Sequence, residues 1–115
     1  MENQKSVRDN HEHAMSLADE AFAAKRRGDM GEAKIRFREA LQYERLAAQS
    51  VANDSQSEPT RSILYRSAAS LALACEEYRE AERLIATALC GSPPNEIASE
   101  LHLLLRQAHQ YLIAA

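Results

Sequence analysis

Apolar residues recur along this chain with the three-to-four-residue spacing of amphipathic helices. This periodicity predicts helices over residues 11–27, 30–52, 59–75, 78–90 and 95–113. Each predicted helix carries one apolar stripe, and we expect the stripes to form the core. The stripe residues are Ala14, Leu17, Ala18 and Ala21 with Phe22 beside them, then Met30, Ala33, Phe37, Ala40, Leu41 and Ala48, then Leu64, Ala68, Leu71, Ala72 and Cys75, then Tyr78, Ala81, Ile85 and Ala88, and finally Ile97, Leu101, Leu104, Leu105, Ala108 and Leu112.

The segments between the predicted helices contain turn residues. Gly28-Asp29 ends the first helix, residues 53–58 form a polar loop, and Gly91-Ser92-Pro93-Pro94 ends the fourth helix. Pro59 suits the first turn of the third helix, where its missing N–H costs nothing. The connection at Glu76-Glu77 lacks glycine, so we expect a tight turn there.

We therefore expect an all-α fold of stacked antiparallel helical hairpins, because short connections favour antiparallel neighbours. Residues 95–113 would form a C-terminal capping helix. Residues 1–10 are polar and aperiodic, and we expect them to be a flexible N-terminus. Residues 11–115 are expected to form a single domain, because a chain of 115 residues holds one modest core.

Composition and charge narrow the functional classes. Hydrophobic residues make up 45% of the chain and aromatic residues only 5%, so close contacts through alanine must provide much of the packing. The net charge of −3 predicts no general attraction to nucleic acid or to anionic membranes. No apolar run approaches the roughly 20 residues that span a bilayer, and Met1–Lys5 does not resemble a signal peptide. We expect a cytoplasmic protein.

Cys75 and Cys90 form neither a disulfide framework nor a CxxC motif. Both lie among apolar residues, so we expect reduced, buried and unreactive thiols that behave as small hydrophobic side chains. A disulfide or a redox pair is the alternative.

Two segments that lie 48 residues apart share a pattern. Gly28-Asp29-Met30 followed by Ala33, Phe37 and Ala40 aligns with Glu76-Glu77-Tyr78 followed by Ala81, Ile85 and Ala88. In this pattern a small residue allows close helix approach, and a large residue four positions later fills the groove between the helices. Ala21 and Ala69 precede the small residues by twelve positions, and Pro93 follows Ala88 by five.

Over residues 14–94 this pattern resembles tetratricopeptide repeats, which implies a tetratricopeptide-like superhelix. The spacing departs from the family period of about 34 residues, and the additional residues fall between Leu41 and Pro59. Residues 58–105 also resemble small uncharacterised helical-repeat proteins of bacteria. The family binds partner peptides on the concave face formed by the first helices of its repeats.

The resemblance implies a protein–protein interaction module, such as an adaptor, a scaffold or a chaperone-like holder. Carried over by repeat position, the partner-binding residues are Met15, Ala18, Phe22, Lys25, Ile63, Arg66 and Ser70. Ala18, Phe22 and Ser67 replace the lysines and asparagines of the family's peptide-carboxylate clamp, which puts that ligand class in doubt. The alternative interpretation is that these are ordinary surface and edge-packing residues.

Other candidate chemistry is weaker. A basic concentration straddles the first turn, but interleaved acidic residues favour a solvated face over nucleic-acid binding. Its members are Lys25, Arg26, Arg27, Lys34, Arg36 and Arg38. His102 and His109 are two helical turns apart, which does not suit a zinc site. Glu76, Glu77, Glu80 and Glu82 are expected to form surface ion pairs with Arg79 and Arg83.

The sequence contains no phosphate loop, no GxSxG motif and no cysteine–histidine nucleophile context. We expect no enzyme activity, no cofactor and no metal. The alternative function is a small regulator that acts in a complex with nucleic acid or with a toxin-like enzyme. We also expect a homodimer, because one end of the stack lacks a cap, because Ile35, Leu46 and Val51 exceed what the first hairpin buries, and because the chain ends in an apolar tail over residues 111–115.

Overall fold

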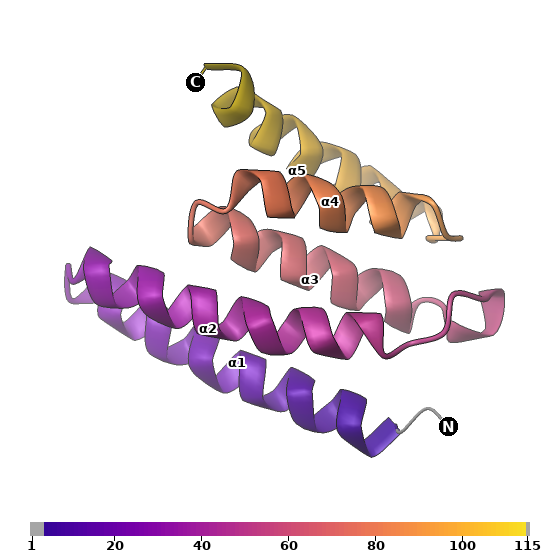
Figure 1. Ribbon diagram of the computed structural model, residues 1–115, viewed down its shortest axis with the longest axis horizontal. Helices are drawn as coiled ribbons and strands as arrows, with labels where there is room; N and C mark the ends of the chain where they lie inside the picture. Colours follow the sequence, from indigo (N-terminus) through magenta and orange to yellow (C-terminus); the bar gives the residue numbers. More distant parts are fainter. Residues whose placement is uncertain (1–3, 115) are drawn as a thin grey trace.

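The computed structural model describes residues 4–114, and its architecture is all α-helical (Figure 1). Within these residues there are five α-helices, one short 3-10 helix and no β-strand. The helices are α1 (Gln4–Arg26), α2 (Met30–Gln49), α3 (Thr60–Ala74), α4 (Tyr78–Leu89) and α5 (Asn95–Ala114), with the 3-10 helix η1 (Ser55–Ser57) between α2 and α3. The predicted fold class and the five predicted helices are confirmed.

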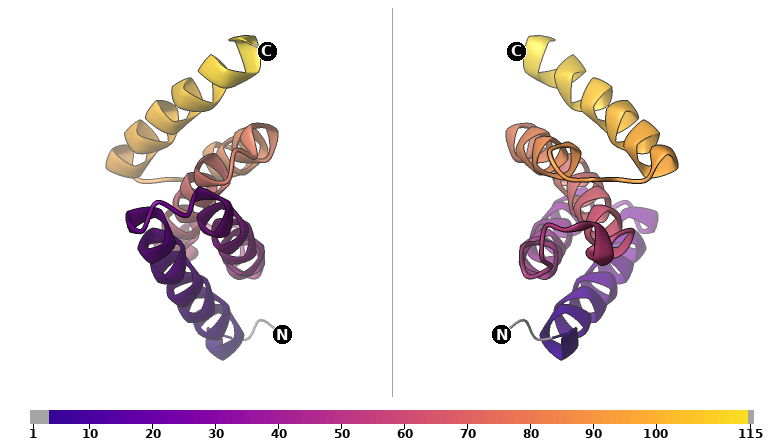
Figure 2. Two further views of the ribbon diagram at one scale, coloured as in Figure 1. Left: turned by 90° about the vertical axis from the view of Figure 1, so that its left-hand side faces the viewer. Right: turned by 90° about the vertical axis from the view of Figure 1, so that its right-hand side faces the viewer.

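The helices stack in the order in which they occur along the chain. Helix α1 packs on α2, α2 on α3, α3 on α4 and α4 on α5, and α3 also contacts α5. Figure 2 shows α1 and α5 at the two edges of this stack. The molecule measures 42 × 34 × 20 Å along its principal axes. The C-terminal helix therefore covers one edge of the stack, and the finer tetratricopeptide-like superhelix stays a prediction.

The first helix begins earlier than predicted. It starts at Gln4 rather than at residue 11, so residues 4–10 are helical; residues 1–3 of the expected flexible N-terminus lie outside the described residues. Val7 packs against the core, and His11, one turn later, bonds to Glu44 of α2. Residues 4–10 were not predicted to be helical because a search for apolar spacing does not register a polar contact such as that of His11.

The starts of α2, α4 and α5 are as predicted, and the other helix boundaries differ from the prediction by one to three residues. Helix α2 ends at Gln49 rather than at residue 52. Pro59 is the N-cap of α3, one residue before the first helical position, and the peptide bond before it is cis. The polar loop contains η1, whose N-cap Asp54 accepts the backbone N–H of Ser57 at 2.9 Å.

Alanine dominates the core, as the composition predicts. Twelve alanines of α1 to α4 have relative exposures of 2% or less, namely Ala14, Ala21, Ala24, Ala33, Ala40, Ala47, Ala48, Ala68, Ala69, Ala72, Ala81 and Ala88. Phe37 and Ile85, the large residues of the repeated pattern, are also buried. Met30 was predicted to be on the buried face but is 58% exposed, because it is the first residue of α2 and lies beside the turn.

The two cysteines differ, which corrects one prediction. Both are helix C-caps, Cys75 of α3 and Cys90 of α4. Cys75 is buried as predicted, whereas Cys90 is exposed. The apolar stripe of α4 ends at Ala88, and a residue two positions later points away from that stripe. Both thiols are free, so the alternative of a disulfide does not apply.

The two hairpin turns have the same hydrogen-bonding pattern. In each, the residue with positive φ donates to the third carbonyl before it, and the next residue donates to the fifth carbonyl before it, as in a Schellman motif. The bonds are Gly28 N to Lys25 O (3.0 Å) and Asp29 N to Ala24 O (2.9 Å) in the first turn, and Glu76 N to Leu73 O (3.1 Å) and Glu77 N to Ala72 O (2.8 Å) in the second. The φ angles are 83° at Gly28 and 64° at Glu76.

Candidate functional site

A groove runs between the N-terminal halves of α3 and α5. It has a volume of about 960 Å³, within the range of peptide and small-molecule sites. Its lining residues are Pro59, Ile63 and Arg66 from the α3 side and Pro94, Asn95, Glu96, Ile97, Ser99 and Glu100 from the α5 side. The groove forms where α5, after packing on α4, comes close to α3.

The groove combines apolar side chains with charged ones. Ile63 is 36% exposed and so presents apolar surface, while Ile97 anchors α5 with only 7% of its surface exposed. The Arg66 guanidinium bonds the Glu100 carboxylate and so links α3 to α5. Both partners of this ion pair are substantially solvated, so the pair adds little to stability and a ligand can replace either partner at low cost.

The starts of the two helices fix the position of the groove. Pro93 and Pro94 cannot continue a helix, so α4 ends before them and the chain turns back. The carbonyl of Pro94 then accepts the backbone N–H of Ala98 at 2.9 Å and begins α5. Pro59 plays the same part for α3, where its carbonyl accepts the N–H of Ile63 at 3.0 Å.

The structure brings together two of the seven predicted partner-binding residues, and one of the others, Ala18 of α1, is buried. Ile63 and Arg66 line the groove, and Ser70 is exposed on α3 but does not line it. Met15, Phe22 and Lys25 all lie on α1, and none of them lines this groove. Met15 is half-buried, whereas Phe22 and Lys25 are exposed.

Sequence reasoning missed the contribution of α5 to the groove. The apolar stripe of the predicted helix over residues 95–113 includes Ile97 as a core residue and does not include Glu100. Whether a residue on α5 faces water or α3 depends on how α5 lies across the stack, which periodicity within one helix does not encode. The local sequence signal was limited to the proline pair before α5 and the single proline before α3.

The predicted basic concentration divides into two parts. Lys34, Arg36 and Arg38 on α2 are paired with carboxylates, namely Lys34 with Glu76 (3.2 Å), Arg36 with Glu32 (2.7 Å) and Glu39 (2.8 Å), and Arg38 with Glu77 (3.5 Å). Hydrogen bonding to Glu39, and then the charge of Glu32, raise the pKa of Arg36. Lys25, Arg26 and Arg27 are exposed and form no ion pair with the described carboxylates.

Glu80 and Glu82 form the predicted ion pairs within α4, whereas Glu76 and Glu77 pair with cations of α2. Arg79 bonds Glu82 at 2.7 Å and Arg83 bonds Glu80 at 3.3 Å, and Glu80 also bonds Arg45 of α2 at 3.0 Å. The hydrogen bond from Arg79, followed by the one with His109, lowers the pKa of Glu82. These carboxylates are thus charged partners of cations and not a pair suited to acid–base catalysis.

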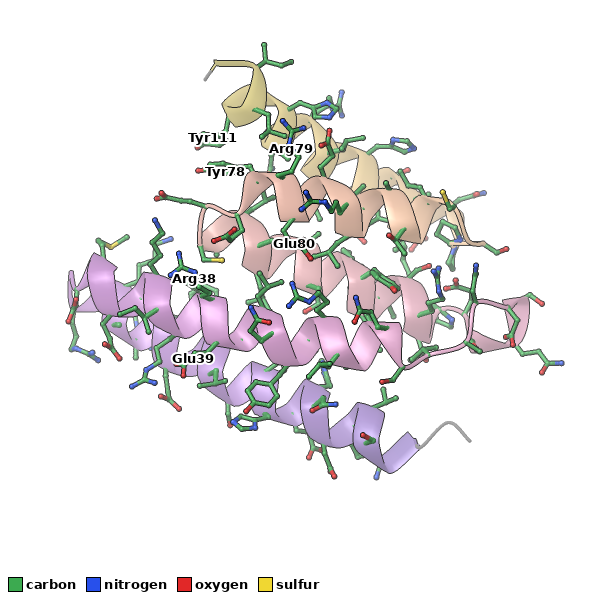
Figure 3. All side chains as sticks on the ribbon, in the orientation of Figure 1. Arg38, Glu39, Tyr78, Arg79, Glu80 and Tyr111 are labelled. Atoms are coloured by element: carbon green, nitrogen blue, oxygen red, sulfur yellow. The ribbon has the colours of Figure 1, made fainter. Side chains whose placement is uncertain are left out.

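An aromatic contact connects α4 with α5. The rings of Tyr78 and Tyr111 stack with centroids 4.3 Å apart and planes 2° from parallel. Figure 3 shows these two rings together near the C-terminal end of α5, with Arg79 and Glu80 beside them on α4 and Arg38 and Glu39 on α2. Burial, and then the charge of Glu76, raise the pKa of Tyr78.

Among the residues whose side chains the structure describes, two charged side chains are buried, and neither lines the groove. Glu44 has no exposed surface, and its two oxygens lie 2.9 and 3.0 Å from Nδ1 of His11. Arg61 is 4% exposed, lies over the ring of Tyr65, and donates from Nη2 to the carbonyl of Thr87 at 3.4 Å. These residues connect α1 to α2 and α3 to α4, so we assign them structural roles.

A glycine makes room for the buried Arg61. A Cβ atom at Gly91 would lie 2.4 Å from Nη1 of Arg61 and 3.0 Å from Oδ1 of Asn53. Any larger residue at position 91 would therefore displace the guanidinium from its place between α3 and the end of α4. The position where α4 ends is thus set by packing as well as by the prolines that follow.

Residues 4–114 contain no group of three or more histidine, cysteine, aspartate or glutamate side chains placed to hold a metal ion. His109 instead contacts Glu82, with 2.9 Å between Nε2 and Oε2. No helix of the described chain has the length and apolar character needed to cross a membrane. Comparisons of the chain with protein-family models, with curated proteins and with solved structures find no match.

Proposed function

We propose that this chain is a protein–protein interaction module without catalytic activity, and that the groove between α3 and α5 holds a segment of its partner. The observation that carries the proposal is the groove itself, which presents the exposed Ile63 beside the solvated pair of Arg66 and Glu100. An apolar anchor site next to a few polar groups is the usual composition of a peptide-binding surface. On its residue pattern we also propose a tetratricopeptide-like stack.

The alternative, a regulator that binds nucleic acid, has less support. Phosphate binding needs cations that are free to contact it. Lys34, Arg36 and Arg38 are committed to carboxylates, and no row of exposed aromatic rings accompanies the remaining cations within the described residues. A protein partner suits this surface better.

A cytoplasmic location and a homodimer are also part of the proposal. Ile35 and Leu46 are 52% and 50% exposed on α2, and Ile113 is 83% exposed near the end of α5. These side chains support self-association by offering apolar surface to a second copy. Sedimentation equilibrium at micromolar concentration tests this, and a single species of 12.8 kDa would contradict the homodimer.

The groove is tested by selecting peptides from a random library on the immobilised protein. We expect enriched sequences whose binding is lost in Ile63→Asp, because a carboxylate in the groove removes the apolar anchor. Leu103→Asp is the matched control, since Leu103 is an exposed aliphatic residue that lines neither the groove nor the apolar surface proposed for the homodimer. Binding is measured for both variants by fluorescence anisotropy.

Two results would contradict the proposed site. Equal loss of binding in Ile63→Asp and Leu103→Asp would show that neither residue marks a specific surface. Unchanged binding in Ile63→Asp, with circular dichroism showing an intact fold, would place the selected peptides elsewhere on the molecule. A selection that enriches no sequence at all would contradict the interaction-module proposal itself.

A further inference from the structure

The end of the first hairpin presents a second surface, formed by Phe22, Lys25, Arg26, Arg27 and Met30. Phe22, Lys25 and Arg26 lie at i, i+3 and i+4 of α1, so they share one side of its last two turns. Arg27 follows in the turn, and Met30 begins α2. We call these five residues the turn surface. Figure 1 shows the α1–α2 turn at the opposite end of the long axis from the starts of α3 and α5.

The aromatic ring of the turn surface is held in position from below. Phe22 meets the buried Phe37 edge-on, with centroids 5.0 Å apart and planes 84° from parallel. Phe22 nevertheless keeps 47% of its surface exposed, and Met30 keeps 58%. Ordering a side chain on binding costs free energy, so a ring already fixed by a core contact is a good anchor.

The charges of the turn surface are unbalanced. Lys25, Arg26 and Arg27 form no ion pair with a carboxylate of residues 4–114, whereas Lys34, Arg36 and Arg38, a few residues later, all do. The nearest acidic residue in sequence is Asp29, whose carboxylate accepts the backbone N–H of Glu32 at 3.1 Å as the N-cap of α2. The chain as a whole carries −3, so this positive end stands out against an acidic molecule.

A simpler explanation accounts for only part of this surface. Cations in the last turn of a helix complement its dipole, which suits Lys25 and Arg26. The carbonyls at that end are already occupied, because Ala24 O and Lys25 O accept the N–H groups of the turn. The dipole gives no reason for Phe22 and Met30 to stay exposed beside the cations.

We propose that the turn surface binds an acidic segment of a partner protein that carries at least one large apolar side chain. The apolar side chain would pack against Phe22 and Met30, and the carboxylates of the segment would pair with Lys25, Arg26 and Arg27. Nucleic acid fits this surface less well, because the turn surface offers one aromatic ring rather than a series of rings on which bases could stack. The proposal adds a second docking site at a distance from the groove.

The test uses a fluorescein-labelled 12-residue peptide of aspartate and glutamate with two interspersed leucines, measured by anisotropy with the full chain. The double variant Lys25→Glu/Arg26→Glu should weaken binding at least about tenfold, and Phe22→Ser several-fold. The control double variant Arg8→Glu/Arg106→Glu changes the net charge equally at two exposed arginines outside the turn surface, and should stay within about twofold. Raising the salt concentration should weaken binding to the parent protein.

The separation from the groove is built into the same experiment. Ile63→Asp should leave binding of the acidic peptide unchanged. The proposal for the turn surface and the proposal for the groove can therefore be contradicted independently of each other. Equal effects of the two charge-reversing double variants, or no measurable binding of the acidic peptide, would overturn the proposal. It would also be overturned if an all-acidic peptide without leucine, or a single-stranded RNA of equal charge, bound as tightly as the leucine-containing peptide.

Discussion

The two hairpins form turns of the same conformation with different residues. Both turns have the same two backbone hydrogen bonds and one residue in the left-handed region, yet that residue is Gly28 in the first hairpin and Glu76 in the second. Glycine adopts this conformation freely, whereas a residue with a side chain is strained there by about 1 kcal/mol or more. The backbone path is therefore set by how the helices pack, and the sequence at the turn adapts to it.

The second hairpin gains a contact with that glutamate. Oε1 of Glu76 lies 3.2 Å from Nζ of Lys34, which belongs to the first hairpin. Both side chains are well exposed, so this ion pair contributes little to stability. It does not offset the strain at Glu76.

The largest expected effect is at the large residue of each hairpin, Phe37 and Ile85. Both are buried, so Phe37→Ala should cost about 3–5 kcal/mol and Ile85→Ala about 2–5 kcal/mol through the cavities left behind. Urea denaturation followed by circular dichroism measures both. If Ile85→Ala lowers the free energy of unfolding by less than an ordinary surface substitution does, the two hairpins are not equivalent.

A smaller effect is expected at the small residues, Ala33 and Ala81. Each is almost fully buried, so Ala33→Leu and Ala81→Leu should each destabilise by about 1–3 kcal/mol through overpacking. Ala86→Leu is the matched control, because Ala86 is exposed on α4, and it should stay within about 0.5 kcal/mol. If Ala81→Leu unfolds at the same urea concentration as the parent, the small residue does not set the helix spacing.

Opposite changes at the two turns should have effects of opposite sign. No atom lies within 4 Å of a Cβ built at Gly28, so Gly28→Ala should destabilise only through its φ angle, by about 1 kcal/mol. Glu76→Gly should stabilise by up to about 1 kcal/mol, because it relieves the strain at φ 64°. Paired denaturation curves decide this, and a loss of stability in Glu76→Gly would show that the glutamate side chain contributes more than its ion pair indicates.

The smallest effect is expected at the two cysteines, Cys75 at the C-cap of α3 and Cys90 at the C-cap of α4. Burial, and then the charge of Glu77, raise the pKa of the Cys75 thiol, so it stays protonated at neutral pH. A raised pKa means that the protonated thiol stabilises the fold below its unfolded pKa, and that this contribution is lost as the pH rises through the folded pKa. With a chromogenic disulfide reagent, Cys90 should react quickly and Cys75 slowly, and fast reaction of both would contradict the burial of Cys75.

Local periodicity was enough to predict the helices and most of the core. Ala33, Phe37, Ala81 and Ile85 have the buried positions that the spacing indicates. The start of α1 was missed because Val7 is the one apolar residue among residues 4–10, and because the contact of His11 with the carboxylate of Glu44 gives no apolar signal. A pattern of residue types does not show that two polar side chains will satisfy each other across a helix interface.

The candidate site was only partly predictable for a different reason. Ile63 and Arg66 were identified from their place in the repeated pattern, but their partners in the groove come from α5, at the far side of a proline turn. The ion pair of Arg66 with Glu100 spans 34 residues and depends on the angle at which α5 crosses α3. That angle is a property of the whole stack, so no window of sequence contains it.

The packing of each helix on its neighbour in sequence also governs how the chain folds and how it unfolds locally. Contacts between adjacent segments close short loops, which costs little chain entropy and favours rapid folding. Opening can begin at either edge, with α1 or α5 detaching while the remaining helices stay packed. Helix α3 contacts α2, α4 and α5, so its backbone amides should exchange with solvent more slowly than those of the two edge helices.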